Sequence, residues 1–261
     1  MKISIITICY NNEREIRATI ESVVNQSYKD IEYIVVDGAS KDGSLAIINE
    51  YKDKIARIVS EPDHGMYEAL NKGFKMATGD IVGMIHAGDR LYSSRVIEKI
   101  AEFYEDNDVD ITYGNSLIVD GNNCVKRVNI SPAFTPKLAY KGWMPSHQSI
   151  YCRKRVFDVA GFYRNDLGGG GDYEWFVRAF VRYGKEVNIM GMDEFIIKFS
   201  LGGQSTKDYS RKLSKRYFDY VKKCWTLNGL KPPFAITWRM FGRKVHQIVL
   251  AKTKQYVSLQ F

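Results

Sequence analysis

The sequence predicts an α/β fold in which helices flank a mostly parallel sheet, with a basic helical extension at the C-terminal end. Within the first 90 residues, short apolar runs alternate with stretches whose apolar residues recur at helical spacing, which is the pattern of consecutive β-α-β units. Several runs are apolar at nearly every position, as in strands that are buried on both faces of a parallel sheet. The third observation is a concentration of basic residues near the C-terminus.

The first half of the chain divides into four expected strands and three expected helices. Asn12 and Glu15 form a capping pair before the first helix, and Asp63 is placed to cap a later helix that Gly79 can end. The expected strands are 3–8, 31–36, 56–60 and 81–85, and the expected helices follow residue 12 and cover 44–51 and 66–77.

The pattern changes after a helix expected near 96–104. Alternating apolar residues at 111–119 and 125–130, on either side of a Gly121-Asn122-Asn123 turn, predict a β-hairpin. Residues 131–172 are interrupted by prolines and glycines and are expected to form long functional loops. Two amphipathic helices are then expected, one at 207–224 and one after Pro232-Pro233.

Charge and cysteine content exclude several classes of protein. Residues 205–261 hold 13 basic and 2 acidic side chains, whereas residues 1–204 hold 25 basic and 28 acidic ones, so the C-terminal segment is expected to face an anionic surface. The four cysteines form no C-x-x-C pair, which favours reduced core thiols over a zinc site or a disulfide framework. No signal peptide and no run of 18 apolar residues is found, so we expect a cytoplasmic protein.

Acidic residues cluster where the expected strands end, at 37–42, 61–63 and 86–89. The carboxyl ends of parallel strands form the ligand-binding edge of an open α/β sheet. Neither the glycine-rich fingerprint of dinucleotide-binding proteins nor a phosphate-binding loop that ends in Lys-Ser or Lys-Thr is present. A bound diphosphate would therefore be neutralised by a metal ion that a carboxylate holds.

Seven segments follow one another along the chain: SIITICYNN (4–12), VVNQS (23–27), EYIVVDGASKDGS (32–44), SEPDHGMYEALNKG (60–73), ATGD (77–80), AGD (87–89) and GDYEW (171–175). In this order they resemble the inverting nucleotide-sugar glycosyltransferases of family two. The resemblance covers about residues 1–205. It implies a GT-A fold with a Rossmann-like sheet, a nucleotide-binding half (1–90) and an acceptor half (91–205), followed by the basic extension (206–261).

The resemblance implies a donor site at the ends of the first strands. Asp37 corresponds to the carboxylate that pairs with the imide of the nucleobase. The other residues expected on the donor side are Thr7, Tyr10, Asn11, Asp63 and His86. From the residues alone, Asp37 is also explained as a strand-end Asp that closes the turn before Gly38.

Asp89 resembles the last Asp of the family's D-x-D-like motif, which implies that it ligates Mg²⁺ or Mn²⁺ at the donor diphosphate. The sequence departs from the usual motif, because Gly88 and His86 stand where the family often has Asp and Asn. A single carboxylate leaves the other ligand positions to water and substrate phosphates.

Asp172 matches the family's catalytic base, which takes the proton of the acceptor hydroxyl while that oxygen attacks the sugar. Glu174 lies two residues further on, so on a helix that begins near Asp172 the two side chains point in different directions. From the residues alone, Asp172 can also be an N-cap after the glycine run at 168–171.

His147, Trp143 and Glu174 are expected on the acceptor side. His147 belongs to a His-Gln pair that the family often shows, although a lone His is also often structural. Trp143 can stack on a sugar face or pack in the core. The segment GGQS at 202–205 resembles one that closes the site.

These features predict an inverting hexosyl- or N-acetylhexosaminyl-transferase that uses a nucleotide-sugar donor, expected to be a UDP-sugar, and a glycan or lipid-linked acceptor of surface-polysaccharide synthesis. The alternatives are a non-catalytic relative that binds nucleotide sugars and a basic nucleic-acid-binding module. The C-terminal helices are expected to lie on an anionic membrane surface at the periphery of the cell membrane, with no nucleic-acid partner. The other explanation for these helices is that their apolar faces pack on the catalytic domain.

Overall fold

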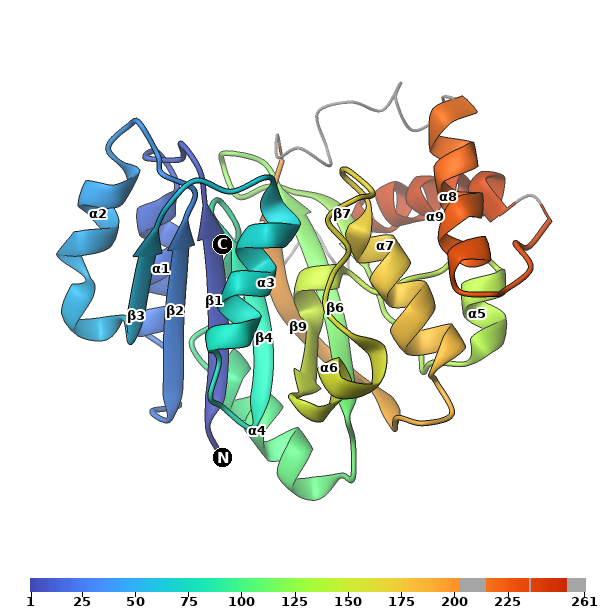
Figure 1. Ribbon diagram of the computed structural model, residues 1–261, viewed down its shortest axis with the longest axis horizontal. Coiled ribbons are helices and arrows are strands. Elements are labelled where there is room, and N and C mark those ends of the chain that lie inside the picture. Colours follow the sequence, from blue (N-terminus) through green and yellow to red (C-terminus); the bar gives the residue numbers. More distant parts are fainter. Residues whose placement is uncertain (202–214, 235, 253–261) are drawn as a thin grey trace.

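The computed structural model describes residues 1–201, 215–234 and 236–252. Within these ranges, nine strands form one sheet in the order β3-β2-β1-β4-β8-β6-β9-β5, and β7 pairs with β6 outside this path (Figure 1). The strands are β1 (Ile3–Cys9), β2 (Ile31–Asp37), β3 (Arg57–Ser60), β4 (Ile81–His86), β5 (Arg90–Leu91), β6 (Ile111–Val119), β7 (Val125–Asn129), β8 (Ile150–Arg153) and β9 (Ile189–Ser200).

Helices cover both faces of the sheet, which confirms the α/β fold (Figure 1). Helices α3, α6 and α7 pack on one face, and α1, α2 and α4 pack on the other. The α-helices are α1 (Ile16–Val24), α2 (Ser44–Glu50), α3 (Met66–Met76), α4 (Val96–Asp106), α5 (Pro136–Tyr140), α6 (Arg155–Ala160), α7 (Gly171–Phe176), α8 (Lys215–Leu227) and α9 (Ile236–Ala251). Shorter turns are η1 (Lys52–Lys54), η2 (His147–Ser149) and the π-helical η3 (Val177–Arg182).

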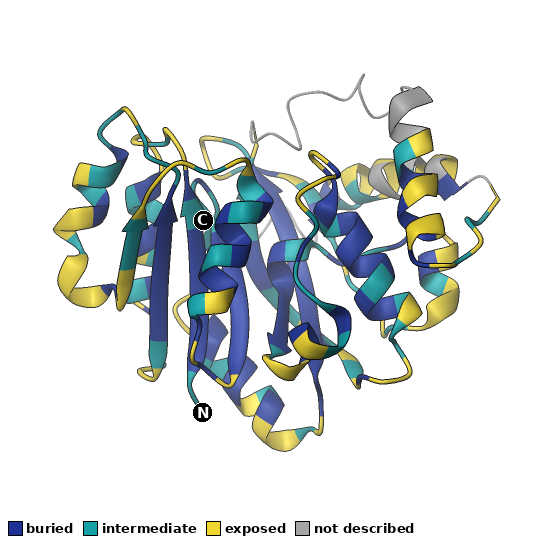
Figure 2. Ribbon diagram, in the orientation of Figure 1, coloured by how far each residue is buried: buried dark blue, intermediate teal, exposed yellow. Residues whose placement is uncertain are grey.

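The first half of the sheet is parallel, as the apolar runs predicted. β1 pairs in parallel with β2 and β4, and β2 pairs in parallel with β3. β1, β2 and β4 are buried along most of their length between the two helical layers, whereas β3 at the edge of the sheet is partly exposed (Figure 2). Their carboxyl ends therefore meet at one edge of the sheet, the upper edge in Figure 1.

Two expected helix caps are wrong, although both helices form. α1 begins after Glu15, and Asn12 contributes only its main-chain carbonyl, which accepts a hydrogen bond from the amide of Ile16 at 3.0 Å. α3 begins after Gly65, whose φ of 122° is a backbone conformation that favours glycine. The carboxylate of Asp63 is instead paired with Lys72 at 2.5 Å.

The second half contains more regular structure than the sequence predicted. The hairpin of β6 and β7 is confirmed. The segment expected to be loops also contains β8, which joins the parallel half to β6 by antiparallel pairing on both sides. β9 was not expected, because its 12 residues mix polar and apolar side chains, yet it runs parallel to β6 along most of that strand.

Helix α8 corrects one expectation about the C-terminal segment. Val221, Cys224 and Trp225 are fully buried in the same core as α3, α6 and α7, so the apolar face of α8 packs on the catalytic domain and does not face a membrane. The expected start of this helix at residue 207, and the GGQS segment, lie outside the described residues. No helix in the described part of the chain is long and apolar enough to cross a membrane.

Candidate functional site

The candidate site lies at the edge where β1, β2 and β4 end. Asp37 at the end of β2 is paired in register with Cys9 of β1, and Ile8 of β1 is paired with His86 of β4. Asp89 follows His86 by three residues. The topology therefore brings the expected donor and metal residues to one edge, as predicted from the ends of the strands.

Asp37 closes the turn that follows β2. Its carboxylate accepts hydrogen bonds from the amide and hydroxyl of Ser40 and from the hydroxyl of Ser60, which lies at 2.6 Å. The side chain is fully buried under these donors. In this geometry Asp37 fulfils the turn-closing role, and its pairing with a nucleobase stays a prediction.

The surface above Asp37 is formed by Gly38, Tyr10 and Asp63. A Cβ atom at Gly38 would lie 3.2 Å from Oδ2 of Asp63 and 3.3 Å from the Tyr10 ring, so glycine permits the close approach of both side chains. Tyr10 is 66% exposed, and its ring is available to stack on a planar ligand. Asn11 is less available, because its side-chain oxygen accepts the amide of Lys41 at 2.7 Å.

Lys72, which the sequence reasoning did not single out, fixes the loop that carries Asp63. Its ammonium lies 2.5 Å from Asp63 and 2.9 Å from Glu61, and it also donates to the carbonyl of Pro62 at 3.2 Å. Hydrogen bonds from Lys72 to these two carboxylates raise its pKa above the ordinary value. Lys72 is therefore charged at neutral pH and ties the 61–63 loop to α3.

Thr7 does not reach the site. It is fully buried, and its hydroxyl is hydrogen-bonded to the hydroxyl of Tyr33 at 3.0 Å. Its side chain alternates with Ile6 and Ile8 and points to the same side as Ile5 and Cys9. The expectation that Thr7 lines the donor pocket is corrected, because the strand periodicity turns it into the core.

Asp89 is held by hydrogen bonds to both of its carboxylate oxygens. Gln148 donates to Oδ2 at 2.6 Å, and the amide of Ser200 donates to Oδ1 at 2.9 Å. Burial raises the pKa of Asp89 to about 6, although these two bonds act against the shift. The carboxylate is therefore mostly ionised at neutral pH and strongly oriented.

Gly88 leaves room for two side chains of the α1 region. A Cβ atom at Gly88 would lie 2.7 Å from Oε2 of Glu15 and 3.4 Å from Nδ2 of the Asn12 side chain. The carboxylate of Glu15 thus occupies the space that a side chain at position 88 would fill. At that position the family that the sequence resembles often has an Asp. Its negative charge also contributes to the raised pKa of Asp89.

Two histidines lie between Asp89 and Asp172. The rings of His86 and His147 meet edge to face, with 5.1 Å between their centroids. Burial lowers the pKa of both, so both imidazoles are neutral at pH 7. Within the described residues, the Nε2 atom of neither ring has a hydrogen-bond partner.

Asp172 lies in the first turn of α7, which is capped by Gly170, so Asp172 is not the N-cap. Its Oδ1 accepts hydrogen bonds from the hydroxyl of Tyr67 at 3.2 Å and from the amide of Tyr173 at 2.8 Å. Its Oδ2 faces Nδ1 of His147 at 3.7 Å, and the side chain is 27% exposed. Oδ2 is therefore the oxygen of this carboxylate that is free to accept a proton.

Adjacent residues connect the two carboxylates. His147 faces Asp172, and the next residue, Gln148, donates to Asp89 and accepts a hydrogen bond from the amide of His86 at 2.7 Å. Gln148 and Tyr67 were not identified as site residues from the sequence. The sequence held a signal for both, because Gln148 belongs to the His-Gln pair and Tyr67 belongs to the 60–73 motif.

Two residues expected on the acceptor side lie elsewhere. Trp143 is buried in the core, where its ring packs edge to face on Tyr113 and Phe176, so the core-packing explanation holds. Glu174 is also buried and forms an ion pair with Arg178 at 2.9 Å. Because Glu174 lies two residues after Asp172 on the helix, it points away from the site.

The residues present supply only part of a divalent metal site. Within the described residues, no group of three or more His, Cys, Asp or Glu side chains could hold a metal ion by itself. Asp89 is the oriented carboxylate at this edge, and each of its oxygens keeps a lone pair after accepting one hydrogen bond. This set fits Mg²⁺ or Mn²⁺ if substrate phosphates and water complete the coordination.

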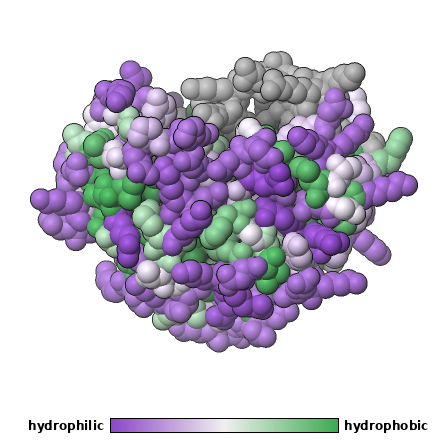
Figure 3. All heavy atoms as spheres, in the orientation of Figure 1, coloured by the Kyte–Doolittle hydropathy of each residue, from purple (hydrophilic) through white to green (hydrophobic). Residues whose placement is uncertain are grey.

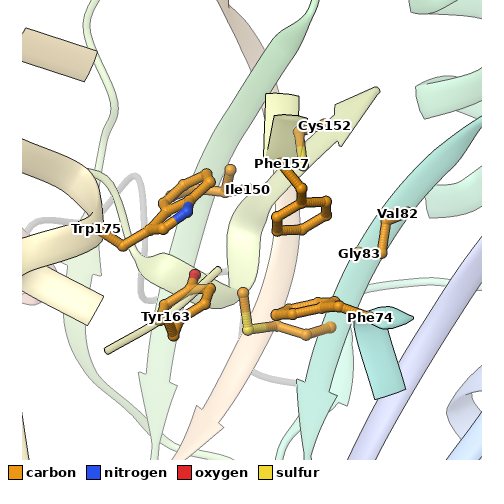
Figure 4. A pocket seen from close by; sticks show the side chains of 9 residues that line it. Phe74, Val82, Gly83, Ile150, Cys152, Phe157, Tyr163 and Trp175 are labelled. Atoms are coloured by element: carbon orange, nitrogen blue, oxygen red, sulfur yellow. The ribbon is translucent and has the colours of Figure 1, made fainter. Parts of the chain in front are cut away.

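The cavity drawn in Figure 4 is not the substrate site. It has a volume of about 10 Å³, which is no more than one water molecule needs. Its lining is apolar and belongs to the core between β4, β8, α3, α6 and α7; the residues are Phe74, Val82, Gly83, Met84, Ile150, Cys152, Phe157, Tyr163 and Trp175. It is a small packing gap.

Comparisons with known proteins agree with the fold and with the resemblance found in the sequence. A family model described as Glycosyl transferase family 2 matches residues 4–162. The uncharacterised glycosyltransferase Rv1514c of Mycobacterium tuberculosis is 32% identical over 181 residues, which is 68% of this chain and 68% of that protein. A PGL/p-HBAD biosynthesis glycosyltransferase of the same species is 28% identical over 182 residues, which is 68% of this chain and 69% of that protein.

Solved structures share the fold at low sequence identity. TarS 1–349 of S. aureus, in complex with UDP-GlcNAc, superimposes with a TM-score of 0.69 and 17% identity over 99% of this chain and 79% of that one. The mannosyltransferase PcManGT of Pyrobaculum calidifontis, in complex with GDP-Man and Mn²⁺, has a TM-score of 0.64 and 16% identity over 99% and 78% of the two chains. These similarities show a common architecture.

Proposed function

The chain belongs to glycosyl transferase family 2 and is a sugar-transferring enzyme with a GT-A fold, and from this premise we propose that it is an inverting transferase. The proposed reaction moves a sugar from a nucleoside diphosphate to a hydroxyl group of a glycan or lipid-linked acceptor. One observation carries the proposal. Adjacent residues His147 and Gln148 connect an accessible carboxylate, Asp172, with a partly buried and oriented one, Asp89.

In the proposed reaction Asp172 is the base. Oδ2 takes the proton of the acceptor hydroxyl, while the hydroxyl oxygen forms a bond to the anomeric carbon and the bond from that carbon to the diphosphate oxygen breaks. The electron pair of the broken bond leaves with the nucleoside diphosphate. Hydrogen bonds from Tyr67 and Tyr173 to Oδ1 hold the carboxylate so that Oδ2 faces the acceptor.

Asp89 is the residue proposed to hold Mg²⁺ or Mn²⁺ together with the donor phosphates. When bound, the cation would neutralise the charge that develops on the leaving diphosphate. Gln148 and Ser200 fix the orientation of Asp89 before any ligand arrives. The presence of Mn²⁺ in the complex of PcManGT supports this proposal.

The donor side is proposed to consist of Tyr10, Asn11, Asp37, Asp63 and His86. The exposed ring of Tyr10 lies beside Gly38, where it can stack on the nucleobase. A UDP-sugar is the favoured donor, supported by the UDP-GlcNAc complex of TarS; the GDP-Man complex of PcManGT makes a GDP-sugar the competing choice. His86, neutral and without a protein partner at Nε2 in the described chain, is the residue proposed to contact a hydroxyl group of the donor sugar.

A donor panel followed by one substitution tests the proposal. The full chain is first screened with UDP- and GDP-sugars for thermal stabilisation, with and without Mn²⁺. With the best donor, Asp172→Asn is expected to lower the rate of nucleoside diphosphate release by about 100-fold or more while donor binding persists, because only the proton acceptor is lost. Asp166→Asn is the matched control, since Asp166 is exposed and paired with Arg164 on the preceding loop.

The outcomes distinguish this proposal from its alternative. If the wild-type chain binds nucleotide sugars but releases no nucleoside diphosphate with any acceptor tested, the protein is the non-catalytic relative. Full activity in Asp172→Asn would show that another group accepts the proton.

We further propose that α9 places the enzyme on an anionic membrane surface, which suits a lipid-linked acceptor. The side of α9 that carries Ile236, Met240 and Ala251 packs on the protein. Trp238, Val245 and Val249 are exposed, and the side chains of Arg239 and Lys252 are exposed beside them. The face of the molecule in Figure 3 is mainly hydrophilic, and its hydrophobic side chains are scattered.

A further inference from the structure

The segment that carries Asp172 has little stability of its own. Helix α7 has six residues and continues directly into the six residues of η3, and an isolated helix of about this total length is still only marginally stable in water. Glycines at 168–170 precede it, and Gly168 has a φ of 61°. The π-helical turn η3 follows it directly. The orientation of Asp172 must therefore come from contacts with other elements.

Helix α8 supplies hydrogen bonds on both sides of Asp172. The hydroxyl of Tyr220 donates to the carbonyl of Gly170, two residues before the carboxylate. The indole nitrogen of Trp225 donates to the hydroxyl of Tyr173 at 2.9 Å, one residue after it. The side-chain amide of Asn228, just beyond α8, donates to Oε1 of Glu174 at 3.1 Å, two residues after it.

The contacts of Trp225 and Asn228 are buried, and that of Tyr220 is partly buried, so water cannot replace them easily. Trp225 is fully buried, and Tyr173 and Glu174 are nearly so. Removing one partner of a buried hydrogen bond leaves the other without compensation. The approach of α8 is also close, since a Cβ atom at Gly170 would lie 2.2 Å from the ring of Tyr220. Only glycine at position 170 permits this distance.

Helix α3 holds the same segment from the other side. The hydroxyl of Tyr67 donates to Asp172, and a Cβ atom at Gly171 would lie 3.1 Å from the Tyr67 ring. Residues 170–174 are therefore fixed between α3 of the nucleotide-binding half and α8 of the C-terminal segment. The segment expected to be a separate extension thus contributes to the geometry of the base.

We infer that α8 is a positioning element of the active site, with Tyr220, Trp225 and Asn228 as positioning residues for Asp172. Each of the three donates a hydrogen bond to a residue that flanks Asp172. Their effect is to keep the Asp172 carboxylate in the orientation in which Oδ2 faces the acceptor. The inference rests on the proposed role of Asp172 as the base.

The test uses two substitutions that remove a donor and keep the ring, Trp225→Phe and Tyr220→Phe, in the full-length chain. Lys222→Gln is the control, because Lys222 lies on the exposed side of α8. Two quantities are measured: hydrogen–deuterium exchange of peptides that cover 168–176, and the steady-state kinetics of diphosphate release from the donor found in the panel.

Loss of either hydrogen bond is expected to increase exchange in 168–176 about tenfold, with exchange in β1 and β4 unchanged. The kcat for diphosphate release is expected to fall about tenfold while the KM for the donor stays within about twofold, because the donor side is not touched. Lys222→Gln is expected to leave both quantities unchanged.

Both changes are required. If exchange in 168–176 or kcat is unchanged in the two variants, or if the KM for the donor changes as much as kcat, the inference is wrong. Failure of the proposed function gives a different result, because wild type would then show no turnover, or Asp172→Asn would keep its activity. Hydrogen–deuterium exchange needs no turnover, so it shows whether α8 stabilises residues 168–176 even if the proposed function is wrong.

Discussion

Three aspartates at the edge of the sheet differ in how their hydrogen bonds are distributed. Asp37 accepts three bonds and is fully buried, Asp89 accepts one bond on each oxygen, and Asp172 accepts two on Oδ1 and keeps Oδ2 open. A carboxylate with a free and accessible oxygen can take a proton, whereas an oriented and mostly buried one is better suited to hold a cation. The difference in partners supports the different roles proposed for Asp172 and Asp89.

His86 is expected to make the stability of the fold depend on pH. Burial, followed by the neighbouring His147, holds the pKa of His86 well below its ordinary value of 6.5. The unfolded chain then binds a proton below pH 6.5 that the folded chain does not bind. Stability contributed by the neutral imidazole is complete above pH 6.5 and is lost as the pH falls below it, by up to about 1.4 kcal/mol per pH unit.

The measurement is urea unfolding of wild type and His86→Asn at about pH 7.5 and about pH 5.5. The loss of unfolding free energy between the two pH values is expected to be about 1 kcal/mol smaller in His86→Asn. His246→Gln, an exposed position on α9, serves as the control and should keep the wild-type difference. The same loss in wild type and His86→Asn would show that His86 does not titrate in this window.

At the scale of elements, β4 and β8 join the parallel half of the sheet to the mixed half. They are paired at only two positions, Ile81 with Arg153 and Val82 with Cys152. Next to these pairs the ring of Tyr151 lies over Gly83, and a Cβ atom at Gly83 would fall 2.2 Å from it. This junction supports His86, the last residue of β4, and Gln148, which precedes β8.

Gly83→Ala is therefore expected to destabilise the protein by about 1–3 kcal/mol through overpacking. Tyr151→Ala creates a cavity and also destabilises the protein. In the double variant the loss of unfolding free energy should be about 1 kcal/mol smaller than the sum of the two single losses, because the methyl group introduced by Gly83→Ala then has room. Denaturant unfolding of the four proteins gives the coupling energy. Gly121→Ala is the control, because a Cβ atom at Gly121 would have no other atom within 4 Å. Strict additivity of Gly83→Ala and Tyr151→Ala would contradict the steric explanation.

The sequence predicted those elements whose signal is local. β1, β2 and β4 were found because their apolar runs are short and bounded by turns, and the Asp residues at their ends followed from the topology. β8 was missed because its four residues lie between prolines and glycines, and β9 because its pairing with β6 depends on residues about 78 positions apart. Trp143 and Glu174 were misplaced because a sequence does not show which side of a short helix or loop faces the core.

The molecule as a whole separates its charges. The 13 basic and 2 acidic side chains of residues 205–261 contrast with the slight acidic excess of residues 1–204. Part of this basic segment, α8, is held by the core through Val221 and Trp225. The helix that follows, α9, packs on β7 and leaves Trp238, Val245 and Val249 exposed. An exposed apolar side with basic neighbours is the arrangement of a helix that lies at a lipid surface.

Vesicle binding tests this arrangement. The full chain is expected to cosediment with vesicles of phosphatidylglycerol and phosphatidylcholine more strongly than with phosphatidylcholine alone, and less strongly as salt is added, because basic side chains attract anionic headgroups. Val249→Glu should weaken partitioning about tenfold, since it places a negative charge on the side of α9 that would enter the interface. Lys52→Glu makes a larger change of charge on exposed η1, away from α9, and should have little effect. If both substitutions weaken binding equally, net charge alone accounts for the attraction and α9 is not the docking element. Displacement of the protein from vesicles by duplex DNA would favour a nucleic-acid partner for the basic segment.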